Sequence, residues 1–163
     1  MELKRIAIDT VPRALDLAQR YRLLNEPEQA SSICQDILDT DPENVEAIRL
    51  LFLATTEQFG KRRGTTYQDA EKVAFRMTGE YEKAYHLGMA CERWARVKLQ
   101  EGAAPSLVSD WLHKALVTYE VAEALRPSGN DDVLLRWNAC MRLIQRVPEQ
   151  SRVDADHEVG IWD

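Results

Sequence analysis

Three histidines and three cysteines are the side chains of this sequence best suited to nucleophilic or acid–base chemistry. His86 and Cys91 form the closest pair, but residues five apart point to well-separated sides of a helix. Cys140 has no base near it in the sequence, and His113 lies in a segment with helical periodicity. We therefore predict that Cys91 and Cys140 are buried as small apolar residues, that His113 is half-exposed, and that none of them is catalytic.

One cluster near the end of the chain has the residue types that bind divalent cations. It consists of Asp154, Asp156, His157 and Glu158, and its spacing matches no known ligand loop. The cysteines lie far apart, which argues against both a zinc site and a disulfide framework. The sequence also lacks a glycine-rich phosphate loop, an H-E-x-x-H motif and a G-x-S-x-G motif. We predict no catalytic residue, no cofactor and no metal, and keep an enzyme whose site only the fold assembles as a third hypothesis.

The charge of the chain is acidic. Aspartate and glutamate outnumber lysine and arginine by 27 to 21, which gives a formal net charge of -6. Such a chain repels nucleic acid and anionic lipid, and we expect neither nucleic acid nor a membrane as a partner. The basic run 61–63 is interpreted as a solvated loop, with weak anion binding as the alternative. Since no apolar stretch is long enough for a signal peptide or a membrane span, we expect a protein of the cytoplasm.

Helical periodicity dominates the sequence. Apolar residues recur at spacings of three and four, and no segment shows sustained alternation with period two. Prolines and glycines interrupt the pattern where helices begin or end, so the sequence predicts an all-α fold of about seven helices. Their expected ranges are 10–24, 27–39, 43–59, 66–77, 80–101, 106–125 and 131–146. These helices form one domain, residues 1–147, followed by an acidic tail, residues 148–163.

A pattern of small and apolar residues recurs along the chain. The first copy ends at a proline and is made by Ala30, Cys34, Ile37 and Pro42. A later copy has the same spacings and is made by Ala115, Tyr119, Ala122 and Pro127. A partial copy without the proline lies between them, at Ala70, Ala74 and Met77. Repetition of this kind indicates stacked copies of one helical unit.

The first helical unit carries a family signature. Ala14-x-x-Leu17-Ala18-x-x-Tyr21, followed by Ala30 and Pro42, resembles the tetratricopeptide repeat, and Ala84-x-x-Leu87-Gly88-x-x-Cys91 is similar to it. The resemblance implies antiparallel helix pairs stacked as a short right-handed solenoid, with the first helix of each pair lining a concave face. The implied units are 11–44, 45–78 and 80–127, with a capping helix at 131–146. An irregular helical bundle is the alternative.

The resemblance also implies a function. Members of this family are scaffolds or adaptors, and we expect a peptide or protein partner in the concave groove. The alternative is a repeat module that assembles with copies of itself into a homo-oligomer. The repeat register places in the core Leu17, Tyr21, Ile33, Ile37, Leu51, Leu87, Leu116, Tyr119 and Trp137. The predicted partner-binding residues, on the face opposite that core, are Leu15, Gln19, Arg22, Arg49, Leu53, Thr56, Tyr85, Met89, Glu92, Leu135, Ala139 and Arg142.

Two further expectations concern peptides that enter this groove. Family members that hold chaperone tails use lysines and asparagines there, and Leu15 with Gln19 departs from that pattern, so we expect no chaperone-tail binding. The acidic tail is hypothesised to bind such a groove in its own or a neighbouring copy. Its anchor residues would be Ile161 and Trp162, because a buried tryptophan is a common interaction hot spot. A solvated terminus is the alternative.

Overall fold

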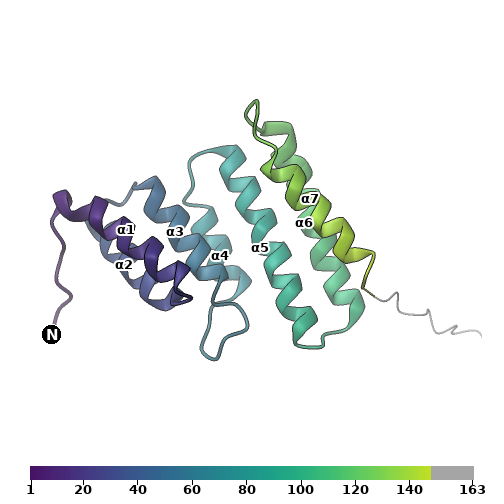
Figure 1. Ribbon diagram of the computed structural model, residues 1–163, viewed down its shortest axis with the longest axis horizontal. Helices are drawn as coiled ribbons and strands as arrows, with labels where there is room; N and C mark the ends of the chain where they lie inside the picture. Colours follow the sequence, from purple (N-terminus) through teal and green to yellow (C-terminus); the bar gives the residue numbers. More distant parts are fainter. Residues whose placement is uncertain (148–163) are drawn as a thin grey trace, which may run out of the picture.

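The computed structural model describes residues 1–147, and within that range the protein is entirely helical, without a strand. Within residues 1–147 this confirms the predicted all-α fold of seven helices. The helices are α1 (Val11–Leu23), α2 (Pro27–Thr40), α3 (Val45–Thr56), α4 (Tyr67–Ala74), α5 (Glu80–Gln100), α6 (Pro105–Leu125) and α7 (Asp132–Ile144), with a short 3-10 helix at Ile8–Thr10. They lie side by side in chain order, from α1 and α2 at one end to α6 and α7 at the other (Figure 1). None of these helices in the described range is both long and apolar enough to span a bilayer.

Local sequence signals set the helix ends. Proline occupies the first turn of α1, α2 and α6, where its missing N–H group costs no hydrogen bond. At the start of α3 the Asn44 side chain accepts a hydrogen bond from the backbone of Ala47. Thr66 and Asp69 form a capping box at the start of α4. The predicted helix boundaries therefore agree with the structure to within a few residues.

The helices make two kinds of contact, one between consecutive helices and one between alternate helices. Each helix packs against the next one, and α1 also contacts α3, α3 contacts α5, and α5 contacts α7. The odd-numbered helices thus form a continuous layer, called here the odd-helix layer. In a single helix pair, one side of α3 and one side of α5 would stay open. Here the neighbouring odd helices cover those sides.

The residues of the recurring pattern are buried between the helices. Ala30, Cys34 and Ile37 are fully buried, and so are their later counterparts Ala115, Tyr119 and Ala122. Gly88 shows the close packing most directly. A Cβ atom at this glycine would lie 2.5 Å from Cδ1 of Tyr119, so the Tyr119 ring of α6 packs against the α5 backbone at a distance that only glycine allows.

The predicted core is partly right. Ile37, Leu51, Leu116 and Tyr119 are buried, whereas Tyr21, Ile33, Leu87 and Trp137 are only partly buried. The prediction for Leu17 is wrong, because this side chain is 41% exposed. Its helix, α1, is the first of the row and has neighbours only on the side of α2 and α3, which leaves the opposite side open.

Candidate functional site

The odd-helix layer joins predicted groove residues through a polar network. On α1, Arg22 forms an ion pair with Glu57, the residue after α3, at 2.6 Å between Nη2 and Oε1. The same guanidinium donates to the amide oxygen of Gln19 at 2.8 Å. Sequence reasoning missed Glu57, since it lies 35 positions from Arg22 and outside the helical spacing that defined the groove. The ion pair fixes Arg22 in one orientation across the boundary between α1 and α3.

Arg93, on α5, is a half-buried charged side chain of this layer that forms no ion pair within residues 1–147. Its Nη1 donates to the hydroxyl of Thr56 at 2.5 Å, and no carboxylate among residues 1–147 lies within ion-pair distance of it. Burial lowers the pKa of the Arg93 guanidinium, and the nearby Arg136 lowers it further. The group remains charged at neutral pH, because even a lowered arginine pKa lies far above 7. A half-buried guanidinium without a counter-ion is a favourable site for a carboxylate.

Glu92, the residue before Arg93, sits at the centre of a second network. Its carboxylate is 2% exposed and accepts a hydrogen bond from the Tyr119 hydroxyl at 2.8 Å. Arg96 donates to the same carboxylate from α5, at 3.0 Å, and Arg136 donates from α7, at 3.4 Å. Burial, followed by the charge of Glu92, raises the pKa of Tyr119. These contacts tie α5, α6 and α7 together around one buried acid.

A hollow of about 510 Å³ opens between α5 and α7, and is called here the α5–α7 hollow. Four predicted groove residues line it, namely Tyr85, Glu92, Leu135 and Ala139. Arg96, Asp132 and Arg136 complete the lining and were not predicted. The structure thus brings together the predicted residues of α5 and α7, while Arg142, near the end of α7, is exposed outside this hollow.

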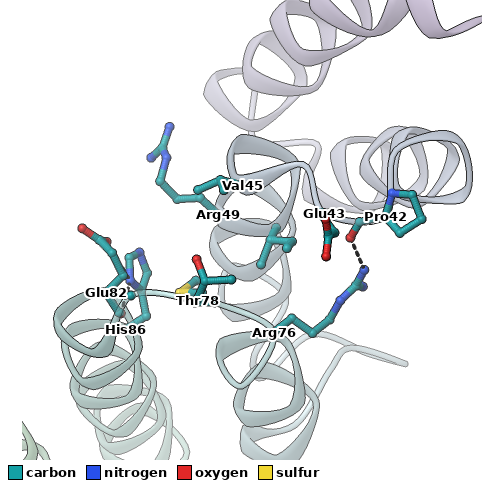
Figure 2. A pocket seen from close by; sticks show the side chains of 11 residues that line it. Pro42, Glu43, Val45, Arg49, Arg76, Thr78, Glu82 and His86 are labelled. Atoms are coloured by element: carbon teal, nitrogen blue, oxygen red, sulfur yellow. Dashed lines mark hydrogen bonds and ion pairs between the residues drawn. The ribbon is translucent and has the colours of Figure 1, made fainter.

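A second hollow, of about 480 Å³, lies between the first turns of α3 and α5, and is called here the α3–α5 hollow. Figure 2 shows its lining, which includes the predicted residue Arg49. Its apolar side chains are Pro42, Val45, Ile48 and Met77. Arg49 forms an ion pair with Glu46 at 2.5 Å, while Arg76 donates to the carbonyl oxygen of Pro42 at 3.4 Å (Figure 2). Glu43 and Glu82 also line it.

His86 belongs to the lining of the α3–α5 hollow and is 4% exposed. Its Nδ1 lies 2.7 Å from the backbone carbonyl oxygen of Glu82, one turn earlier. The ring contacts Phe52 edge-on, with centroids 4.9 Å apart. Burial lowers the pKa of His86, so the ring is neutral at pH 7.

Some of the residues predicted to line the groove are buried in the core. Leu53 and Met89 are 8% and 4% exposed, so the prediction that they lie on an open face opposite the core is wrong. Thr56 and Glu92 are buried as well, and their polar atoms take part in the networks described above. The physical reason is the contact of α3 with α5, which turns the facing sides of both helices into core. Leu15 is half-buried against the core and Gln19 is held by Arg22.

The reactive side chains occupy unreactive surroundings. Burial raises the pKa of Cys34 and of Cys140 to about 12, and it also raises the pKa of Cys91, so these thiols are protonated at neutral pH. His113 is exposed, with Nδ1 2.8 Å from the carbonyl oxygen of Ser109. No group of three or more metal-ligating side chains occurs in the range 1–147. The acidic cluster at 154–158 and the anchors Ile161 and Trp162 lie outside the described residues.

No protein-family model matches the sequence, and no curated protein matches it either. The two networks and the two hollows lie along the odd-helix layer, which presents arginine side chains beside apolar ones.

Proposed function

We propose that the protein is a tetratricopeptide-type scaffold that binds an acidic segment of a partner protein across its odd-helix layer. The repeat positions and the contacts between odd helices support the repeat arrangement. In such an arrangement the first helices of successive pairs adjoin one another, as α1, α3 and α5 do here. The two helical signatures also lie on α1 and α5, the first helices of their pairs.

The unpaired guanidinium of Arg93 carries the proposal for an acidic partner. The two networks contain four arginines, Arg22, Arg93, Arg96 and Arg136, and two acids, Glu57 and Glu92. Their sum is a local charge of +2 in a chain whose formal net charge is -6. Charge segregation of this kind favours a partner of opposite sign, because it steers encounter and fixes orientation. A carboxylate bound at Arg93 would form the direct ion pair that Glu57 and Glu92, which act on this guanidinium from a longer distance, do not make.

The test replaces Arg93 by Gln in the full-length protein and compares partner capture from native cell extract by mass spectrometry. Arg13→Gln, an exposed arginine of α1, is the matched control. We expect the proteins captured by the wild type to be lost with Arg93→Gln and kept with Arg13→Gln, and the capture to weaken as salt concentration rises. Capture that is equal for all three proteins would refute the role of Arg93.

A stability measurement separates this role from a structural one. Because Arg93 is a half-buried charge without a counter-ion, Arg93→Gln should leave the melting temperature unchanged or raise it. A marked fall in melting temperature would show that Arg93 serves the fold. Loss of capture at unchanged stability is the result that supports binding.

Self-assembly is the second candidate function, favoured by one observation on α6. Val117, Val121 and Leu125 are 62%, 53% and 48% exposed and lie four residues apart, which places them on one side of the helix. An apolar row of this kind suits contact with the same row of a second copy. Val121→Glu should then convert a concentration-dependent oligomer into a monomer in light scattering. A wild-type protein that is monomeric at all concentrations would remove this candidate.

A further inference from the structure

His86 offers an unused hydrogen-bond acceptor to the α3–α5 hollow. A backbone carbonyl can only accept, so the nitrogen 2.7 Å from the Glu82 oxygen, Nδ1, carries the proton. In the neutral ring Nε2 is then a bare acceptor. Within residues 1–147 the ring's hydrogen bond is made by Nδ1, and no side-chain or backbone group there donates to Nε2.

This acceptor is reachable from the hollow. No fully buried side-chain nitrogen or oxygen in the described range lacks a hydrogen-bond partner. Since Nε2 has no partner, it cannot be fully buried, and the small exposed fraction of His86 includes this atom. The hollow therefore combines apolar side chains with an acceptor at His86, besides the carboxylates of Glu43 and Glu82, and a fitting ligand is an apolar ring that carries a donor.

Among amino-acid side chains, tryptophan has this chemistry, because its indole is a large apolar surface whose N–H group only donates. The chain carries such a side chain near its end, Trp162, flanked by Ile161 and Asp163. We propose that the α3–α5 hollow is the docking site of the chain's own C-terminal segment, with the Trp162 indole between α3 and α5 and its N–H group donated to Nε2 of His86. This site is separate from Arg93 and does not depend on the proposed partner.

The length of the chain allows this docking. Sixteen residues follow Val147, and a fully extended segment of that length reaches about 50 Å. Helix α5, against which α7 packs, has 21 residues and is about 31 Å long. The whole length of α5, including His86 near its start, is therefore within reach of the segment after α7.

The charged rim of the hollow sets the orientation of the segment. Arg76 donates to a backbone carbonyl and has no acidic partner among residues 1–147, whereas Arg49 is already paired with Glu46. Arg76 is thus the rim group available to Asp163. The rim also carries Glu43 and Glu82, so its charges balance. The indole contacts, rather than net charge, supply the binding.

The test follows the Trp162 indole N–H signal by NMR in the full-length protein, assigned with Trp162→Phe. Val45→Glu places a charge at the mouth of the hollow at a position that is 67% exposed. An acidic residue at the first turn of α3 is tolerated by the helix. Leu107→Glu, at a position that is 42% exposed in the first turn of α6, is the matched control outside the hollow.

The proposal gives a definite set of results. The Trp162 N–H group should exchange with solvent about tenfold faster in Val45→Glu than in the wild type, because its hydrogen bond and its cover are lost. Leu107→Glu should exchange like the wild type. Equal exchange in all three proteins, or a wild-type signal at the position of the free peptide 149–163, would overturn the proposal. Protection that increases with protein concentration would also overturn it, because the segment would then occupy a second copy.

Discussion

Gly88→Ala is the substitution that most directly tests the close approach of α5 and α6. The added Cβ atom would lie 2.5 Å and 2.6 Å from Cδ1 and Cε1 of Tyr119. The tyrosine ring cannot move aside freely, because it is fully buried and its hydroxyl is bonded to Glu92. The methyl group therefore forces the helices apart or displaces the ring from its hydrogen bond.

The change in the free energy of unfolding is the balance of one stabilising and two destabilising contributions. Alanine favours the helix over glycine by about 1 kcal/mol. Overpacking of a buried contact costs about 1–3 kcal/mol, and weakening a hydrogen bond to a charged carboxylate costs about 1.5–3 kcal/mol. The net expectation is a loss of about 1.5–5 kcal/mol in the free energy of unfolding, taken from the same terms. For a chain of this size that lowers the melting temperature by roughly 3–20 °C.

Urea denaturation of four proteins provides the assay: the wild type, Gly88→Ala, Tyr119→Leu and the double variant. Removing the ring removes the clash, so in the Tyr119→Leu background Gly88→Ala should be neutral or stabilising by up to about 1 kcal/mol. The coupling between the two sites should exceed about 1 kcal/mol. A Gly88→Ala protein that is more stable than the wild type would refute the reasoning, since helix propensity alone would then explain the result.

Three further predictions concern stability. Glu92→Gln should cost about 2 kcal/mol in urea denaturation, because Tyr119, Arg96 and Arg136 lose a charged acceptor, whereas Glu46→Gln, in an exposed pair, should change stability by about 0.5 kcal/mol or less. Leu17→Ala should cost about 1 kcal/mol or less and Ile37→Ala about 2–5 kcal/mol, and equal costs would show that the burial of α1 is misassigned. The folded-state pKa of His86 is lowered from 6.5 by burial, with Arg49, Arg93 and Arg136 adding to the effect. The unfolded chain therefore binds the proton first as pH falls, and stability present above pH 6.5 is lost below it. His86→Phe should lack this step between pH 7.5 and 5.5, and an unchanged step would assign it to another group.

Sequence reasoning located the helices because their ends are local events. Pro27 and Pro105 begin helices and Thr66 caps one, and each acts within one turn of its own position. The repeat spacing also identified buried residues, such as Ala30 and Ala115, because contact between adjacent helices imposes the same small residue in each unit. Both kinds of signal are contained in a short window of sequence.

The candidate site was less accessible, since it depends on contacts between distant segments. The ion pair of Arg22 with Glu57 and the hydrogen bond of Arg93 with Thr56 join residues 35 and 37 positions apart. No periodicity within one helix contains such a distance. Burial of Leu53 and Met89 has the same origin, because α3 and α5 cover each other only once the helix pairs are stacked.

On α5, the residues predicted to line the groove lie one position away from the residues whose polar groups face α3. The sequence pattern selected the row of Tyr85, Met89 and Glu92, whereas the acceptor and the unpaired guanidinium belong to His86 and Arg93. Neighbouring positions differ by about 100° around a helix, so the two rows face different neighbours. Tyr85 lines the hollow toward α7 and His86 the hollow toward α3. His86 and Arg93 are seven residues apart, which is about two turns, and they share one side of α5. The choice of row therefore decides which chemistry the site presents.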